Sequence, residues 1–241
     1  MFAVYYRPDL KGAAEELKRR LGAVDLSCDE EFSHVFILGG DGTLLYAIRE
    51  FPCVLDAVVV HLGMGSVNFY RSASPGTPLD EIVGSIASGN YRVVELPTLA
   101  CGECTALNEV LIHRTEPGRP LRFRLVTDEG ELAGRADGVI VSTPQGALGY
   151  AVSALGPAVD YRADVIVVSF AAPFTLYLRP LVLASDSVVV ETADSSVLVC
   201  DGRVAGSGTR FEVRRGSRRL RLAVVGRLRY LDRVLERLKS L

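Results

Sequence analysis

The chain has 241 residues, of which 49% are hydrophobic and 23% are charged, with 27 Lys and Arg against 29 Asp and Glu. This length suits one large or two modest domains, and the formal net charge of -2 leaves no basic excess to bind nucleic acid or an anionic membrane. No apolar run approaches the ~20 residues of a membrane helix, and residues 1–12 show no secretory signal, so we expect a cytoplasmic protein.

The segment 1–92 alternates between strand and helix signals. Apolar runs predict strands at residues 2–6, 35–38 and 57–62. Helices are predicted over 10–21, from Thr43 to the residue before Pro52, and after Thr77, which we expect to be an N-cap followed by Pro78 at the first helical position. Apolar strands connected through helices predict a parallel sheet covered on both faces, and therefore a Rossmann-like α/β domain.

Residues 93–227 have a different pattern, in which short β-prone runs are separated by turn signals such as Glu116-Pro117-Gly118. The predicted strands cover residues 110–113, 121–127, 139–142, 165–170, 187–191, 197–200, 211–214 and 220–225. They predict a mostly antiparallel, β-rich domain, so the expected fold class is α/β plus all-β. A helix over 228–241 has one apolar face, which we expect to pack back on the first domain; its residues are Leu231, Val234, Leu235, Leu238 and Leu241.

Lysines, cysteines and histidines exclude or disfavour several kinds of site. The only lysines are at positions 11, 18 and 239, and none follows a glycine turn, which excludes a P-loop, a protein kinase and Schiff-base chemistry. The five cysteines are scattered along the chain, at Cys28, Cys53, Cys101, Cys104 and Cys200. The CxxC pair at 101 and 104 lacks the second pair or the nearby His of a zinc site. We therefore expect ordinary strand cysteines. His34, His61 and His113 show no metal-binding spacing and are expected to be core or strand-edge residues.

The turn Gly39-Gly40-Asp41-Gly42-Thr43 follows a predicted buried strand and opens a predicted helix. A parallel sheet binds ligands at this edge, and glycines together with a helix N-terminus allow main-chain N–H groups to converge on a phosphate without any lysine. A carboxylate repels that anion, so Asp41 is explained if it accepts a proton from a hydroxyl nucleophile or helps to hold a cation that bridges phosphates. The alternative is a glycine turn in which Asp41 caps the helix.

Two further segments carry candidate site residues. Asn108-Glu109 pairs an amide with a carboxylate that can bind sugar hydroxyls or an amino group, although taken alone the pair fits a solvated strand edge better. In the second segment, a predicted buried strand is followed by a loop of small residues that enters a predicted helix. This segment contains Arg135, Asp137, Ser142-Thr143-Pro144-Gln145-Gly146, Tyr150 and Ser153. Such a loop can enclose a planar or phosphorylated ligand, or it is a structural Pro-Gly loop.

Taken in this order, the three segments resemble the NAD kinase family over nearly the whole chain. In that family GGDG is the phosphate and catalytic loop, NE contacts the dinucleotide, and a DG…STPxGSTAYxxS stretch completes the NAD pocket. The matching residues here are Gly39–Gly42, Asn108-Glu109, and Asp137 through Ser153. Arg179-Pro180-Leu181-Val182-Leu183 and Cys200-Asp201-Gly202 are also similar to the family's sequence.

The chain departs from this family at several positions. Where the family motif has the sequence STAY, this chain has Ala147-Leu148-Gly149-Tyr150. Two hydroxyl groups that the resemblance places near the adenine are therefore missing. In the glycine-rich segment after the third strand, Gly65-Ser66-Val67-Asn68, the residue Asn68 replaces a glycine, and Tyr46 replaces a residue that is often basic. These changes affect adenosine recognition and leave the phosphoryl-transfer centre intact.

The resemblance implies a kinase that transfers a phosphoryl group from ATP or polyphosphate to the 2′-hydroxyl of the adenosine ribose of NAD, in a cleft between two domains, 1–92 with the returning helix and 93–227. Asp41 would take the hydroxyl proton and, with Gly42, contact the substrate. Phosphates would be held by Gly39, Gly40, Gly42, Thr43 and Arg135, with Mg²⁺ neutralising charge and Asp41 as its one candidate ligand. The substrate would be bound by Asn108, Glu109, Asp137, Leu148, Gly149, Tyr150 and Ser153.

Two alternatives stay open at this point. The first is a kinase with the same loop that acts on a lipid, a sugar or another nucleotide. The second is a dinucleotide sensor without turnover. The family resemblance also implies a homodimer or homotetramer that assembles through the β-rich domain.

Overall fold

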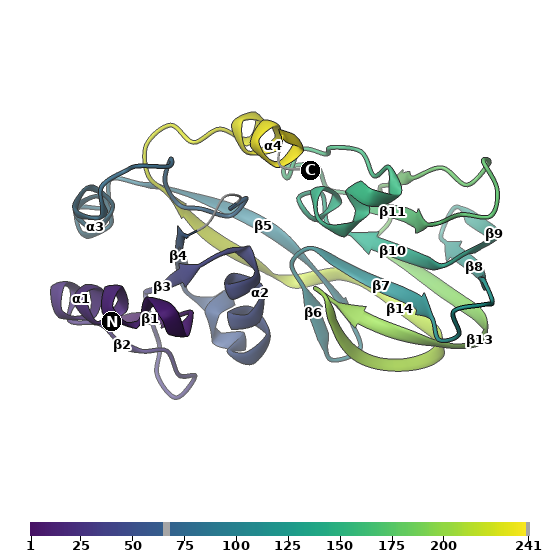
Figure 1. Cartoon of the computed structure of the whole chain (residues 1–241), viewed down its shortest axis with the longest axis horizontal. Helices are drawn as coiled ribbons and strands as arrows, with labels where there is room; N and C mark the ends of the chain where they lie inside the picture. Colours follow the sequence, from purple (N-terminus) through teal and green to yellow (C-terminus); the bar gives the residue numbers. More distant parts are fainter. Residues whose placement is uncertain (65–67, 240–241) are drawn as a thin grey trace. The chain divides into compact units, whose positions relative to one another are not determined.

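The computed structural model describes residues 1–64 and 68–239, which form two compact units (Figure 1). Unit 1 contains Met1–Leu96 and Arg219–Leu241, and unit 2 contains Pro97–Arg218. Strands β5 (Arg92–Cys101) and β14 (Arg203–Val224) contribute residues to both units. Residues 65–67 of the predicted glycine-rich segment and Leu241 of the predicted terminal helix lie outside the described residues.

Unit 1 is built on a parallel sheet with the strand order β14-β4-β3-β1-β2. Its strands other than β14 are β1 (Phe2–Tyr6), β2 (Val24–Asp25), β3 (His34–Gly39) and β4 (Val58–Gly63). β3 and β4 pair in step from His34 opposite Val58 to Gly39 opposite Gly63. Both strands therefore end at the same edge of the sheet, and the segments that follow them begin side by side.

Helices cover both faces of this sheet, as predicted. α1 (Lys11–Leu21) and α3 (Leu79–Ala87) pack on the face that carries Val4. α2 (Asp41–Glu50) packs on the opposite face, where the ring of Tyr46 stacks on that of Tyr5 with 5.9 Å between centroids. Short 3₁₀ turns at Pro8–Leu10 and Pro52–Asp56 precede α1 and follow α2. The predicted cap of α3 at Thr77 is wrong by one residue, because the helix begins after Pro78 and has no side-chain cap.

The last helix, α4 (Tyr230–Lys239), belongs to unit 1, which confirms the predicted return of the chain end to the first domain. The predicted leucine face is wrong, however, because Leu231 and Leu235 are 68% and 55% exposed whereas Val234 is buried. A polar contact sets the rotation of the helix: the buried guanidinium of Arg233 donates to the carbonyl oxygen of Phe69. Within the described part of the chain, no helix is long and apolar enough to cross a membrane.

Unit 2 is a β structure whose strand pairs are antiparallel, in the order β12-β11-β10-β7-β13-β14, with β8 and β9 attached to β13 and β6 attached to β5. Its remaining strands are β6 (Cys104–Ala106), β7 (Glu109–Arg114), β8 (Leu121–Thr127), β9 (Gly130–Ala136), β10 (Gly138–Ser142), β11 (Ile166–Ala171), β12 (Leu181–Leu183) and β13 (Ser187–Cys200). A large apolar cluster forms the core of the unit, and within it the rings of Phe123 and Phe170 stack at 5.3 Å; a smaller cluster contains Ile140, Ala151 and Ala171. The predicted fold class is therefore confirmed.

The strand pattern of unit 2 differs from the prediction in the length of some strands and in additional strands, among them the short β6 and β12. β13 and β14 each join two runs that the sequence predicts as separate strands. β9 was not predicted, because its glycines and charged residues disfavour a strand. It forms because all of its residues pair with β8, from Gly130 opposite Thr127 to Ala136 opposite Leu121.

The expectation of ordinary strand cysteines is wrong for four of the five. Cys28 is bonded to Cys53 in unit 1, and Cys104 is bonded to Cys200 in unit 2, while Cys101 is free and buried. The two residues of the CxxC pair are therefore not bonded to each other: Cys104 is bonded to Cys200, and Cys101 keeps its thiol. The bonded cysteines are separated by 25 and 96 residues, so local spacing in the sequence could not predict these pairings.

Candidate active site

The Gly39–Thr43 segment forms a tight turn between β3 and α2. Gly40 is the N-cap of α2 in an extended conformation, and its carbonyl oxygen accepts a hydrogen bond from the N–H of Thr43 at 2.9 Å. Gly39 has φ 151°, and a Cβ at this position would collide with the side chain of Thr43. Only glycine therefore fits at residue 39.

The carboxylate of Asp41 is fixed by the main chain of a distant segment of unit 1. Oδ2 accepts from the N–H of Phe69 at 2.8 Å, and Oδ1 accepts from the N–H of Tyr70 at 3.2 Å. The side chain is 26% exposed, so it is held in place and still accessible. Asp41 is thus an oriented carboxylate at the N-terminus of α2, where the helix dipole favours anionic groups.

A buried histidine, His61, lies behind Asp41, and no sequence motif links these two residues. His61 Nε2 lies 3.1 Å from the carbonyl oxygen of Gly39, which can only accept, so Nε2 carries the hydrogen. Nδ1 is then the basic nitrogen, and it lies 4.0 Å from Asp41 Oδ1. Burial holds the pKa of His61 below its usual value, while the charge of Asp41 opposes that shift. The side-by-side pairing of β3 and β4 is the signal that could have linked these residues.

In unit 2, one carboxylate binds the backbone at the start of the Asn108-Glu109 segment. Asp201 accepts from three consecutive N–H groups, those of Leu107 at 2.7 Å, Asn108 at 2.9 Å and Glu109 at 3.0 Å. In return, the N–H of Asp201 donates to the carbonyl oxygen of Glu109 at 3.0 Å. Asp201 was noted in the sequence only as part of the family resemblance, and its contacts span more than ninety positions of the chain.

The carbonyl side of the same segment is bound by the loop after β10. The hydroxyl of Thr143 donates to the carbonyl oxygen of Leu107 at 2.7 Å, and the amide of Gln145 donates to the same oxygen at 2.9 Å. The N–H of Thr143 donates to the carbonyl oxygen of Asn108 at 2.9 Å. A Cβ on Gly146 would collide with the backbone of Asn108. The predicted loop and the predicted Asn-Glu segment are therefore packed directly together.

The loop continues in two 3₁₀ turns, Gly146–Leu148 and Tyr150–Ala154, in place of the predicted helix. Glu109 is buried, and its Oε2 accepts from the N–H of Tyr150 at 3.4 Å. A Cβ on Gly149 would lie 2.6 Å from that oxygen. Leu148 is buried, whereas Tyr150 is 45% exposed. The hydroxyl of Ser153 donates to the carbonyl oxygen of Tyr150 at 2.7 Å. Three predicted residues, Glu109, Gly149 and Tyr150, thus lie together beside Asn108, and Leu148 and Ser153 belong to the same two turns.

Asp137 and Arg135 lie elsewhere in unit 2. Ser142, at one end of β10, pairs with Glu109, whereas Asp137 precedes the other end, about 16 Å away at ~3.3 Å per residue. The carboxylate of Asp137 is paired with Arg114 at 2.9 Å. Within unit 2, the structure therefore does not bring these two predicted residues together with the Asn108-Glu109 segment.

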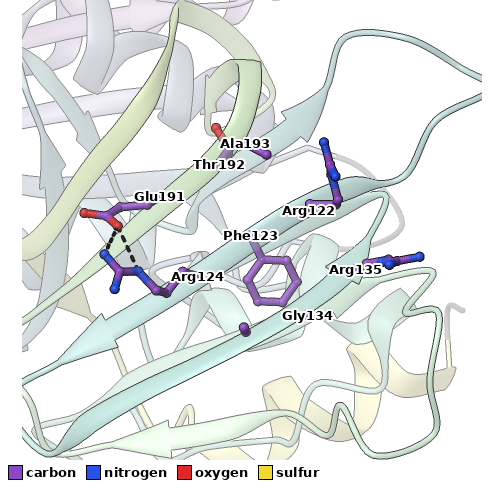
Figure 2. A pocket seen from close by; sticks show the side chains of 9 residues that line it. Arg122, Phe123, Arg124, Gly134, Arg135, Glu191, Thr192 and Ala193 are labelled. Atoms are coloured by element: carbon purple, nitrogen blue, oxygen red, sulfur yellow. Dashed lines mark hydrogen bonds and ion pairs between the residues drawn. The ribbon is translucent and has the colours of Figure 1, made fainter.

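Arg135 instead borders a cavity of about 520 Å³ on the β8–β9 hairpin (Figure 2). Arg122 lies directly opposite it on the neighbouring strand. Arg124 is joined to Glu191 at 2.6 Å, as Figure 2 shows. Like charges directly opposite in a strand pair are unfavourable, and here nearby carboxylates offset the charge, since Arg122 lies 3.7 Å from Asp194 and Glu191 also lines the cavity.

The described residues offer no protein-built metal centre. Among residues 1–64 and 68–239, no three His, Cys, Asp or Glu side chains are grouped so that they could hold a metal ion. Asp41 has carboxylate oxygens that already accept main-chain hydrogen bonds. Any divalent cation here would take most of its ligands from a phosphorylated substrate and water, as Mg²⁺ commonly does.

These features define an α/β unit with a phosphate-type turn at the carboxyl edge of its parallel strands, joined to a β-rich unit. The family model described as "ATP-NAD kinase C-terminal domain" matches residues 107–224. The NAD kinase of Corynebacterium diphtheriae is 34% identical over 223 residues, which cover 85% of this chain and 70% of that protein. The chain therefore belongs to the NAD kinase family.

Further comparisons fit this assignment. The NAD kinase of Buchnera aphidicola is 34% identical over 163 residues, which are 64% of this chain and 55% of that protein. The chain thus spans about half the length of the first curated relatives that it matches. A crystal structure of an NAD kinase from Archaeoglobus fulgidus in complex with ATP superposes with a TM-score of 0.79 at 23% identity, covering 100% of this chain and 99% of that one. At this identity the likeness shows the fold.

Proposed function

We propose that the protein transfers a phosphoryl group from ATP, or from polyphosphate, to the 2′-hydroxyl of the adenosine ribose of NAD, which forms NADP. Membership of the NAD kinase family supports this activity, as do the named relatives. The observation that carries the proposal is the placement of Asp41, an accessible carboxylate held by two main-chain hydrogen bonds at the N-terminus of α2.

In this proposal, unit 1 is the phosphate-binding and catalytic domain. Asp41 accepts the proton of the attacking hydroxyl, and its fixed orientation reduces the reorganisation that the reaction needs. Gly39, Gly40, Gly42 and Thr43 hold the donor's phosphates at the helix N-terminus, where the dipole stabilises negative charge. The divalent cation, Mg²⁺, enters with ATP as part of the substrate, and Asp41 is its candidate protein ligand.

Unit 2 is proposed as the dinucleotide-binding domain. Asn108 and Glu109 bind the substrate, and Leu148, Gly149, Tyr150 and Ser153 line the same site. The close approach of Gly149 and Tyr150 to the side chain of Glu109 supports this group, and Ser153 is bonded to Tyr150 in the same turn. Roles for Arg135 as a phosphate contact and for Asp137 as a substrate contact stay predictions from the family motif.

The assembly and the location of the protein are also proposals. We propose a homodimer or homotetramer that forms through unit 2, supported by exposed apolar side chains between β11 and β12: Tyr177 is 94% and Leu176 83% exposed.

A cytoplasmic location stays a prediction from the sequence. Two disulfides are unusual in the cytosol of mesophiles and common in intracellular proteins of hyperthermophiles.

The activity is tested by incubating the purified protein with NAD, NADH, adenosine and diacylglycerol, each with ATP or with polyphosphate at equal phosphate concentration. We expect phosphorylation of NAD or NADH at the 2′-position and no phosphorylation of the other acceptors. Phosphorylation of diacylglycerol or a nucleoside in place of the dinucleotides would contradict the proposal, and so would saturable NAD binding without NADP formation.

A further inference from the structure

The backbone of the Asn108-Glu109 segment depends on a carboxylate from another part of the chain. We propose that Asp201 is a positioning residue for the dinucleotide: it fixes the main chain of Asn108 and Glu109 so that their side chains meet the substrate. This inference rests on the proposed function, because it takes Asn108 and Glu109 as the residues that bind NAD.

The hydrogen bonds of Asp201 are of a strong kind. Its carboxylate accepts from three consecutive main-chain N–H groups at 2.7 to 3.0 Å. Hydrogen bonds to an ionised acceptor are about twice as strong as neutral ones, and consecutive N–H groups that converge on one anion form a compact anion site. Leu107 is fully buried, so its N–H would lose a partner that water cannot easily replace.

The turn that carries Asp201 is itself rigidly placed. Asp201 and Gly202 have φ values of 45° and 78° in the tight turn between β13 and β14. Aspartate tolerates this left-handed conformation better than most residues. The neighbouring Cys200 is bonded to Cys104, only three positions before Leu107. The turn and the substrate segment are therefore joined both covalently and by hydrogen bonds in both directions.

This arrangement predicts an effect on one substrate and not on the other. The three bonds of Asp201 go to the main chain of the substrate segment in unit 2, whereas the phosphate turn at Asp41 has its own main-chain partners in unit 1. Loss of Asp201 should therefore weaken NAD binding while ATP use by the folded protein stays nearly normal.

The test uses Asp201→Asn and Asp201→Ala in the full chain, with Asp128→Asn as the matched control. Asp128 also sits in a hairpin turn, and its carboxylate accepts from the hydroxyl of Ser185 at 2.6 Å. KM for NAD and for ATP is measured well below each variant's melting temperature, together with hydrogen exchange of the amides of residues 107–109. We expect KM for NAD to rise about tenfold or more in Asp201→Asn and further in Asp201→Ala, with KM for ATP changed less than about twofold.

The exchange measurement separates this inference from the proposed function. Faster exchange at residues 107–109 with a selective rise in KM for NAD supports positioning by Asp201. Unchanged KM for NAD, or a parallel rise in both KM values, overturns it. If the wild-type protein forms no NADP, the proposed function fails, and unchanged exchange in the variants would then overturn the positioning role independently.

Discussion

Asp41 in unit 1 and Glu109 in unit 2 are both candidate site carboxylates, but the backbone around each is shaped in a different way. The backbone of the Asp41 turn takes its conformation from its own residues, because Gly39 has a positive φ and no room for a Cβ beside Thr43. The Glu109 segment is shaped by residues from distant positions, Asp201 on its N–H side and Thr143 on its carbonyl side. The first arrangement is encoded locally, whereas the second exists only after the β structure has formed.

This difference predicts that a change at Asp41 alters chemistry with little effect on the rest of the molecule. In Asp41→Asn, the side chain keeps an oxygen that can accept a main-chain hydrogen bond but loses the basic carboxylate. We expect kcat to fall by about 10²–10⁴-fold, with the dissociation constant for NAD changed less than about threefold. Near-normal turnover would remove Asp41 from the chemistry, and steady-state kinetics with isothermal titration calorimetry measure both quantities.

In unit 2, the tight packing between loop and segment is tested at Gly146. A Cβ there would collide with backbone atoms of Asn108, which cannot move aside as a flexible side chain can. Gly146→Ala should lower the free energy of unfolding by about 1–3 kcal/mol and weaken NAD binding. Gly206→Ala is the control, since a Cβ at that position meets nothing within 4 Å. Equal denaturation midpoints for the two variants would show that the loop can relax.

The two disulfides provide a direct comparison between the units. Loop-closure entropy predicts a loss of about 4.7 kcal/mol for removal of the Cys104–Cys200 bond and about 3.5 kcal/mol for the Cys28–Cys53 bond, given their separations of 96 and 25 residues. The double variant Cys104→Ser/Cys200→Ser should also raise KM for NAD, because Cys200 adjoins Asp201.

The corresponding Cys28→Ser/Cys53→Ser variant is the control and should leave KM for NAD unchanged. Thermal denaturation and kinetics with and without a dithiol reductant measure these effects. A rise in KM for NAD of the same size in both double variants would show that the link to Asp201 is not the cause.

A smaller effect is expected from the buried histidine behind Asp41. Because burial holds the pKa of His61 below its usual value, the unfolded chain binds more protons than the folded chain as pH falls below about 6.5. Stability is therefore present above that pH and lost below it, with a slope of at most about 1.4 kcal/mol per pH unit for one proton. Urea denaturation from pH 8 to pH 5 should show a smaller slope for His61→Gln than for the control His113→Gln. Equal slopes would rule out His61 as the source.

The sequence was sufficient for those parts of the molecule that local patterns determine. Strands β1, β3 and β4 and the Gly39–Thr43 turn follow from apolar runs and glycine positions, whereas β2 and the parallel pairing of β14 with β4 do not. The face of α4 did not follow, because the hydrogen bond of Arg233 to Phe69 outweighs the leucine pattern. β9 depends on pairing with β8, which local propensity does not contain.

The candidate site divides in the same way. Asp41, Asn108 and Glu109 were found as motifs, but the contacts that orient them come from Phe69, Tyr70 and Asp201, far away in the sequence. Both disulfides likewise depend on the folded structure, since each joins two cysteines that are far apart in the sequence. The candidate site residues could therefore be identified from the sequence, whereas the main-chain groups and side chains that orient them could be identified only in the folded structure.

The central claim is that Asp41 acts on the ribose hydroxyl of a bound dinucleotide. A crystal structure of the protein with NAD tests it most directly, through the distance from the Asp41 carboxylate to the ribose 2′-oxygen. We predict a hydrogen bond of about 2.6–3.2 Å between them. A well-ordered NAD molecule whose 2′-oxygen lies beyond the reach of Asp41, with no bridging water, would contradict the account.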